Sequence, residues 1–143
     1  PILFWLIEQR AHWTAAFLMV QKEMAERLTG EVGTKSYGRL TVMIGAFLNV
    51  KTCFTIPPDV FIPKPKVKSA IIKLVKRHDP LIEDKYFERF EKIVAAAFSR
   101  RRKMLRNTLS DFGLPEEIQK KIDFTRRPET LSISEFSELA KTI

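Results

Sequence analysis

Hydrophobic positions along the chain alternate between helical spacing and short continuous apolar runs, and these two patterns predict its elements. Helical spacing covers residues 1–11, 22–28 and 37–48. Runs that predict strands cover residues 13–20, 51–56 and 67–76. The first run has no polar face, which is typical of a strand buried inside a parallel sheet. The second and third runs lie too close together for a helical crossover, so we expect them to pair antiparallel as an edge hairpin.

Beyond residue 78 the pattern becomes entirely helical. A long helix is expected over residues 84–110, with Asp84 as its N-cap and Gly113 as its terminator. A short helix over 115–122 follows, and Ser132 to Glu135 has the spacing of a capping box that opens a last helix. The chain is therefore predicted to combine an α/β part over residues 1–78 with an all-α domain over residues 79–143.

A basic segment lies inside the predicted long helix. Five of the seven residues from Arg100 to Arg106 are Lys or Arg, and apolar residues keep returning around them at helical steps. Such spacing predicts cations held on a packed helix rather than on a disordered tail. Rigid guanidinium groups suit phosphates, because the planar fork donates paired hydrogen bonds. A polyanion such as RNA or DNA is the partner that this segment favours.

The helical period divides these cations between faces. Arg102 and Arg106 would share one face, Arg100 and Lys103 a neighbouring face, and Arg101 would fall near the apolar stripe as an interdomain anchor. Two alternatives remain open at this point. The cations could form a solvated face, or they could pair with the preceding carboxylates Glu88 and Glu91.

The charge of the chain is unevenly distributed, which supports the polyanion. The formal net charge is +8, and residues 61–143 hold 19 Lys and Arg against 12 Asp and Glu, whereas residues 1–60 hold six against five. Such asymmetry is typical of proteins that bind nucleic acid or an anionic surface. A thermostable protein with a solvated surface rich in Lys, Arg and Glu is the alternative.

Several function classes are disfavoured by composition. The single cysteine, Cys53, excludes an internal disulfide, and two isolated histidines do not make a metal site, so a reducing, cytoplasmic compartment is expected. No apolar run reaches about 18 residues, so no membrane span is predicted. The glycine-rich motifs of nucleotide and cofactor sites are missing from this sequence, so we expect no cofactor-binding residues in it.

The proline-rich segment over residues 56–70 carries a second candidate site. Prolines on both sides would hold Phe61 in one conformation, as a stacking platform for a base requires. Lys64, Lys66 and Lys68 follow at alternate positions and could track a phosphate backbone from one side of an extended segment. The alternative is that Phe61 plugs the loop and the lysines are solvated.

Two further cations lie at predicted helix starts. Lys22 follows the first strand at its carboxyl end, where ligands of open α/β sheets bind. Arg39 lies on the first turn of the next helix. Each is a candidate phosphate ligand, and each is equally compatible with an ordinary exposed helix start.

Four motifs, in this order and spacing, resemble the small-subunit rRNA adenine N6,N6-dimethyltransferase family. They are Gln21-Lys22-Glu23, Lys35-Ser36-Tyr37-Gly38-Arg39-Leu40, Pro57-Pro58-x-x-Phe61-x-Pro63-x-Pro65-Lys66-Val67-x-Ser69-Ala70 and Phe98-Ser99-x-Arg101-Arg102-Lys103-x-Leu105-Arg106-Asn107. The resemblance covers essentially the whole chain. One departure is Arg100, which stands where Gln or Asn is frequent and keeps the basic character.

This resemblance implies a fold. Residues 1–78 would hold the last three strands of a Rossmann-like class I methyltransferase sheet, with the last strand antiparallel. Residues 79–143 would be the helical RNA-contacting domain. The family's glycine-rich S-adenosylmethionine loop and its Asn-Leu-Pro-Tyr motif lie upstream of the position that Pro1 matches. We therefore expect a C-terminal portion that, alone, binds neither cofactor nor substrate productively.

The resemblance also implies a function. The intact enzyme would transfer methyl groups from S-adenosylmethionine to N6 of two adjacent adenosines near the 3′ end of small-subunit rRNA, as a cytoplasmic monomer that acts in ribosome biogenesis. Phe61 would be one wall of the stack around the flipped adenine. The expected RNA contacts are Lys22, Arg39, Lys64, Lys66, Arg100, Arg102, Lys103 and Arg106.

Two other functions share this fold. Relatives that serve as mitochondrial transcription factors would bind DNA or a polymerase. A non-catalytic assembly factor would bind the small subunit without methylating it. The upstream tetrapeptide and the identity of the substrate would distinguish the three.

Overall fold

A computed structural model describes residues 2–142 of the chain, so Pro1, which was expected in the first helical turn, lies outside the described residues. The helices are α1 (Ile2–Glu8), α2 (Lys22–Leu28), α3 (Arg39–Gly45), α4 (Phe87–Ser99), α5 (Leu105–Thr108), α6 (Glu116–Lys121) and α7 (Ile133–Lys141). The strands are β1 (Ala15–Gln21), β2 (Leu48–Ile56) and β3 (Ser69–Lys76). Every predicted element has a counterpart, with shifted bounds, except that the long helix is divided.

The three strands form one sheet in the order β1-β3-β2. The last strand in sequence is the central one and runs antiparallel to both neighbours, which pair with it at Leu18↔Ile72 and Thr52↔Ile72. The expected β2–β3 hairpin and the antiparallel last strand are therefore confirmed. A register shift between Thr52 and Phe54 places a bulge in β2.

One prediction about the sheet was wrong: β1 is not buried on both faces. Its exposure alternates along the strand, and Phe17 and Met19 are 61% and 55% exposed. The inward residues Leu18 and Val20 pack against the core instead. The apolar residues of β1 lie on both faces of the sheet, and the helices cover only one of them. The apolar side chains on the other face are therefore exposed.

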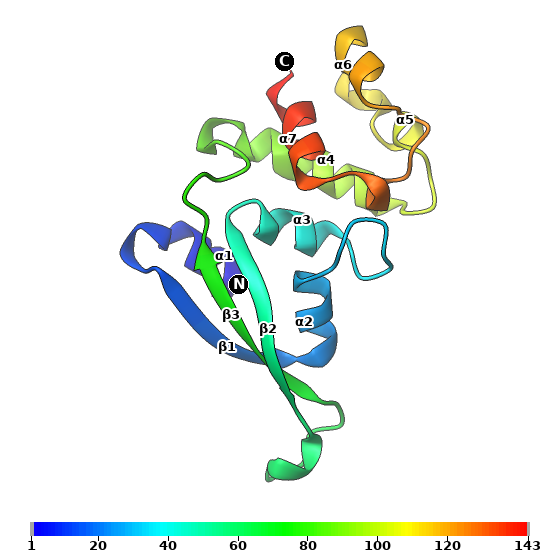
Figure 1. Cartoon of the computed structure of the whole chain (residues 1–143). Coiled ribbons are helices and arrows are strands. Elements are labelled where there is room, and N and C mark those ends of the chain that lie inside the picture. The colour runs from blue at the N-terminus through cyan, green and yellow to red at the C-terminus, as the bar shows by residue number, and fades with distance from the viewer. Residues whose placement is uncertain (1, 143) are drawn as a thin grey trace.

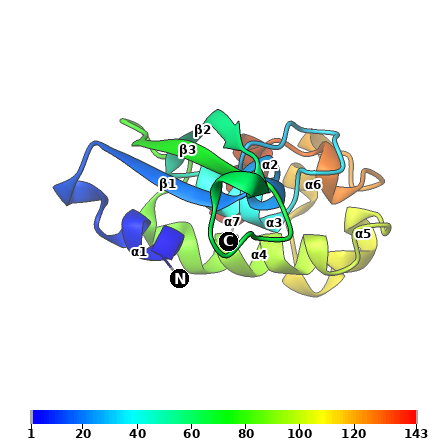
Figure 2. The same cartoon turned by 90° about the horizontal axis from the view of Figure 1, so that it is seen from below.

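The helices cover only one face of this sheet. Figures 1 and 2 show α3 between the sheet and α4, and α7 packs against α4. Ile72 of β3, Val42 of α3 and Phe90 of α4 are all fully buried in one hydrophobic cluster. This cluster continues to Phe136 of α7, so a single core runs across residue 78 from the α/β part into the helical part.

The predicted helix over residues 84–110 is broken, and this is the main correction. It consists of α4, a turn over residues 100–104, and α5. Arg100 leaves helical geometry with φ −134° and ψ 76°, and Met104 is extended with φ −70° and ψ 153°. Asp84 does not cap α4, because its carboxylate accepts a hydrogen bond of 2.9 Å from Arg10. Gly113, at φ 57°, ends the 3₁₀ turn after α5 rather than the long helix.

The start of α7 follows the predicted capping box. The Ser132 hydroxyl accepts from the Glu135 amide at 3.1 Å, and the Glu135 carboxylate accepts from the Ser132 amide at 3.0 Å. Arg126 also donates to this carboxylate, at 2.7 Å. The Arg126 hydrogen bond lowers the pKa of Glu135, so this group stabilises the fold above its ordinary pKa and loses that contribution on acidification.

The loop between α2 and α3 is held by hydrogen bonds to backbone carbonyls of the helical part. The Tyr37 hydroxyl donates to the Leu131 carbonyl at 2.6 Å, and the Gly33 amide donates to the Glu129 carbonyl at 2.7 Å. Gly33 has φ 87°, a conformation that other residues rarely adopt. The Tyr37 ring meets Phe98 of α4 edge-on, with 6.3 Å between centroids. Burial raises the pKa of Tyr37, so the hydroxyl keeps its proton and remains a donor.

We predict that Tyr37→Phe lowers the free energy of unfolding by about 1–2 kcal/mol, because the buried Leu131 carbonyl loses its side-chain donor. Urea denaturation measures the change. Tyr86→Phe is the matched control, since the Tyr86 hydroxyl forms no hydrogen bond within residues 2–142. Equal stability of the two variants would contradict a stabilising role for the Tyr37 hydroxyl.

Candidate nucleic-acid interface

The turn after α4 is organised by the guanidinium group of Arg101. Its Nη2 donates to the Thr34 carbonyl at 3.0 Å and to the Tyr37 carbonyl at 2.6 Å. The expected role of Arg101 as an anchor between the two parts is thereby confirmed. The chain leaves the helix at Arg100, and the turn closes with a hydrogen bond of 2.8 Å from the Lys103 amide to the Arg100 carbonyl.

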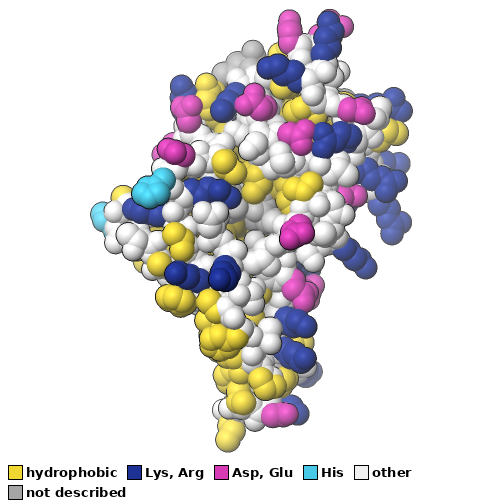
Figure 3. Space-filling model, viewed as in Figure 1, with side chains coloured by type: hydrophobic (Ala, Val, Ile, Leu, Met, Phe, Trp, Pro, Cys, Tyr) yellow, Lys and Arg dark blue, Asp and Glu magenta, His cyan; other side chains and the backbone are white. Residues whose placement is uncertain are grey.

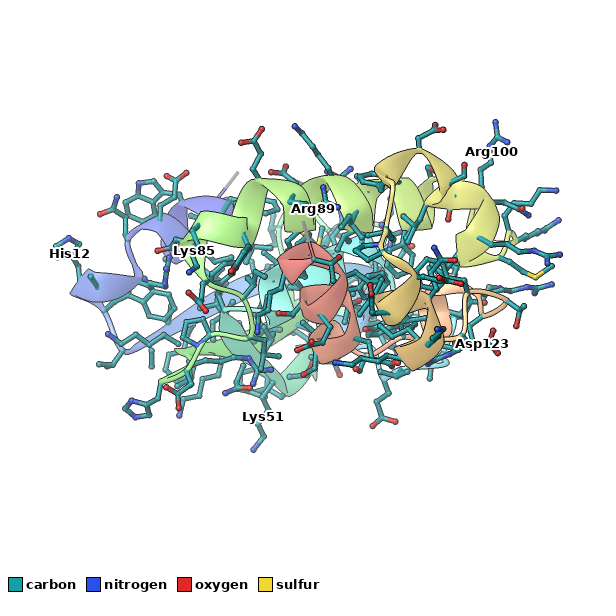
Figure 4. The ribbon with its side chains drawn as sticks, turned by 90° about the horizontal axis from the view of Figure 1, so that it is seen from above. His12, Lys51, Lys85, Arg89, Arg100 and Asp123 are labelled. Atoms are coloured by element: carbon teal, nitrogen blue, oxygen red, sulfur yellow. The ribbon has the colours of Figure 1, made fainter. Side chains whose placement is uncertain are left out.

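The neighbours of Arg101 point outward instead. Arg100, Arg102 and Lys103 are exposed, and Figure 4 shows Arg100 extending away from the ribbon. Arg106 is exposed on α5, whose first amides donate to the carbonyls of residues 126 and 124 at 3.0 and 2.9 Å. The four cations therefore lie on a fixed turn and a short helix, which we call the basic turn (Arg100, Arg102, Lys103 and Arg106). The predicted division between two faces of one helix is wrong.

Salt bridges do not account for the basic turn. Within residues 2–142, Glu88 pairs with Lys92 at 2.9 Å, and Glu91 lies 4.0 Å from Arg39. The predicted alternative, in which these two carboxylates neutralise the cluster, is therefore not found. The cations remain available to an external anion.

The two cations at helix starts lie as predicted on α2 and α3. Lys22 is exposed with its Nζ 3.9 Å from Glu26, and its amide donates to the Lys68 carbonyl at 2.9 Å. Arg39 is exposed and lines a cavity together with Arg101. Lys35 lines the same cavity, a residue that the sequence motifs contained but that was not predicted as a contact.

The proline-rich segment forms the tip of the β2–β3 hairpin, far from the basic turn in Figure 1. Phe61 is half-buried after the 3₁₀ turn Pro58–Val60, and its amide donates to the Pro58 carbonyl at 3.2 Å. Lys64 pairs with Asp59 at 2.7 Å, whereas Lys66 is exposed. Bends interrupt residues 61–67, so the predicted extended segment with lysines along one side is not formed.

Charged and apolar side chains occupy different parts of the surface. Figure 3 shows Lys and Arg gathered along the edge where the residue 100–106 segment lies, continuing down toward the hairpin. Hydrophobic side chains gather over the lower sheet and hairpin, where Phe17, Met19 and Phe54 are exposed. The molecule therefore presents a basic edge beside an apolar sheet face.

Other kinds of site are not found within residues 2–142. The His, Cys, Asp and Glu side chains of these residues include no group of three placed to bind a metal ion. None of the helices in this range has the length and apolar character needed to cross a bilayer.

A family model described as "Ribosomal RNA adenine dimethylase" matches residues 1–143. The chain belongs to this family. "Ribosomal RNA small subunit methyltransferase A" of Xylella fastidiosa (strain Temecula1 / ATCC 700964) is 44% identical over 141 residues, which are 98% of this chain and 53% of that protein. The protein of the same name from Salinibacter ruber is 43% identical over 99% of this chain and 48% of that protein. The chain thus spans about half the length of these relatives of the dimethylase family.

Solved structures agree with the family assignment. A dimethyladenosine transferase from Plasmodium falciparum superposes with a TM-score of 0.83 at 26% identity, covering 97% of this chain and 60% of that one. The 23S rRNA methyltransferase ErmE gives a TM-score of 0.70 at 25% identity, covering 98% and 58%. The expected fold, part of a Rossmann-like methyltransferase sheet followed by helices, is confirmed by these neighbours.

We predict that Arg101→Ala loosens the junction, because the Thr34 and Tyr37 carbonyls lose a charged donor. Amide hydrogen exchange should accelerate on the order of tenfold or more over residues 34–38 and 100–104. Arg102→Ala removes the same charge from an exposed neighbour and should leave this exchange unchanged. Identical exchange in the two variants would show that Arg101 does not hold the junction.

Proposed function

We propose that this chain is the RNA-positioning part of an S-adenosylmethionine-dependent enzyme that dimethylates N6 of two adjacent adenosines near the 3′ end of small-subunit rRNA. The basic turn is the observation that carries the proposal. It offers four exposed cations on a backbone that the Arg101 hydrogen bonds hold in place. The relatives are named as rRNA methyltransferases, which favours this function over transcription or non-catalytic assembly.

RNA is the partner that the chemistry of the turn favours. Guanidinium groups bind phosphate oxygens in pairs, and each neutralised phosphate releases counterions. Because its backbone is already held in place, the basic turn loses less conformational entropy on binding than a flexible tail does. It can therefore also set the orientation of the RNA. We propose Lys22, Arg39, Lys64 and Lys66 as additional contacts, with Lys64 first released from Asp59. Action as a cytoplasmic monomer during ribosome biogenesis belongs to the same proposal.

The ends of β1 and β2 differ from the strand ends that usually hold a nucleotide-type cofactor. β1 continues directly into α2 without a glycine, and β2 is followed by Pro57 and Pro58. Neither strand end offers the glycine-rich loop that lets a backbone approach a nucleotide closely. The contribution of this chain to the proposed reaction is to bind and orient RNA.

Phe61 is the proposed contact to the target base. A flipped adenine loses its stacking neighbours, and an aromatic ring offsets part of that loss. The half-buried ring lies at the hairpin tip after a short 3₁₀ turn, so its backbone is constrained. In this proposal the hairpin tip holds the base while the basic turn holds the RNA backbone at a distance.

We predict that the double substitution Arg102→Ala and Arg106→Ala weakens binding to small-subunit rRNA and makes its salt dependence shallower. Two lost phosphate contacts should reduce the slope of log K against log salt by roughly 1.5. Fluorescence anisotropy at several salt concentrations measures both quantities. Lys51→Ala with Lys85→Ala removes equal charge elsewhere and is the control. Unchanged affinity and slope relative to that control would remove the basic turn from the interface.

We predict that Phe61→Ala, introduced into a full-length enzyme that carries this chain, lowers turnover by about 10–100-fold while cofactor affinity stays the same. The reason is that base stacking is lost without a change at the cofactor. Methyl incorporation into small-subunit particles and calorimetric cofactor titration give the two readouts. Ile62→Ala, at a fully exposed neighbouring residue, is the control. Equal turnover of the two variants would contradict the stacking role.

A further inference from the structure

A cavity of about 690 Å³ opens between α1, α2, α3 and the turn that holds Arg101. It is separate from Phe61 at the hairpin tip. Its lining combines cationic, carboxylate, polar and apolar side chains, and its volume lies within the range of about 300–1,000 Å³ that is usual for small-molecule sites. The residues that matter here are Phe4, Lys35, Arg39, Leu40, Met43 and Arg101.

The charge of the lining favours an anion. Four cations, Arg27, Lys35, Arg39 and Arg101, face two carboxylates, Glu23 and Glu26, which leaves a net charge of +2.

Both carboxylates already lie close to cations on α2. Glu23 accepts from Arg27 at 2.8 Å, and Glu26 lies 3.9 Å from Lys22. Lys35 forms no ion pair within residues 2–142, and Arg39 has only the 4.0 Å contact to Glu91. These last two side chains can therefore bind a phosphate without breaking a short ion pair.

The lining of the cavity also includes apolar side chains. Phe4 of α1 is 39% exposed, Leu40 of α3 is half-buried, and Met43 lies beneath them with 2% exposure. An exposed aromatic ring beside aliphatic side chains offers a flat surface on which a base can stack. The lining thus offers apolar groups suited to a base and cationic groups suited to a phosphate.

We propose that this cavity binds one unstacked nucleotide of the RNA, with its base against Phe4 and Leu40 and its phosphate on Lys35 and Arg39. The proposal rests on the proposed function, because that function supplies RNA as the partner. Arg101 lines the cavity from the same turn that presents Arg100 and Arg102 to solvent. An RNA backbone bound on the basic turn would therefore pass the mouth of the cavity.

The first test measures the affinity of the chain for a short single-stranded RNA. Lys35→Ala with Arg39→Ala should weaken binding about tenfold, as expected for two lost phosphate contacts at moderate salt. The control pair is again Lys51→Ala with Lys85→Ala. Lys51 lies opposite Lys73 on the sheet face away from the helices, and Figure 4 shows it pointing away from the body. Equal affinity of the two double variants would overturn the phosphate assignment.

The second test isolates the base by methyl NMR, with adenosine 5′-monophosphate and ribose 5-phosphate as probes. The nucleotide should shift the Met43 and Leu40 methyl signals more strongly than the sugar phosphate does, because only the nucleotide carries a base. Phe4→Ala should abolish that difference, whereas Phe17→Ala, which removes an exposed ring from the open sheet face, should preserve it. Equal shifts from the two probes would overturn the base assignment.

The outcomes also separate this proposal from the proposed function. If RNA binding depends on Arg102 and Arg106 but not on Lys35 and Arg39, the cavity proposal fails and the proposed function stands. If the chain does not bind RNA in any variant, both fail. Binding of the free nucleotide with no effect of Lys35 and Arg39 on RNA affinity would identify a site for free nucleotides and contradict the proposal.

Discussion

The geometry of the basic turn depends on one guanidinium group, that of Arg101. By donating to the carbonyls of Thr34 and Tyr37, it pulls the end of α4 onto the loop between α2 and α3. Arg101 points inward, whereas its neighbours Arg100 and Arg102 are exposed. Without those two hydrogen bonds the cations would lie on a mobile segment, and the conformational entropy lost in ordering that segment would oppose binding.

The same loop joins the two parts of the molecule. Gly33 and Tyr37 reach the segment before α7, while the buried core continues from β3 through α3 to α7. The basic turn and the hairpin that carries Phe61 are therefore connected through packed elements rather than through a flexible linker. This rigidity is consistent with the proposed function, in which RNA is held at one end while a base is positioned at the other.

Local patterns in the sequence were sufficient for most elements. The capping box at Ser132 depends on residues three positions apart, and the hairpin on the short spacing between two strands, so both were predictable. The break at Arg100 was not, because the carbonyls that Arg101 binds lie 67 and 64 residues away, whereas apolar periodicity continues through the segment. The cavity was missed for the same reason, since α1, α2, α3 and the Arg101 turn meet there only in the folded chain. The motif residues Lys35 and Arg39 were visible, but their shared cavity was not.

The most direct test of the proposed RNA contacts is ultraviolet cross-linking of the chain to small-subunit rRNA, with the cross-linked peptides identified by mass spectrometry. We predict cross-links in the peptides that contain residues 100–106, in those of the cavity around residues 35–43, and at the hairpin tip around Phe61. Cross-links confined to the open sheet face around Phe17 and Met19, with none on the basic edge, would contradict the proposed RNA contacts.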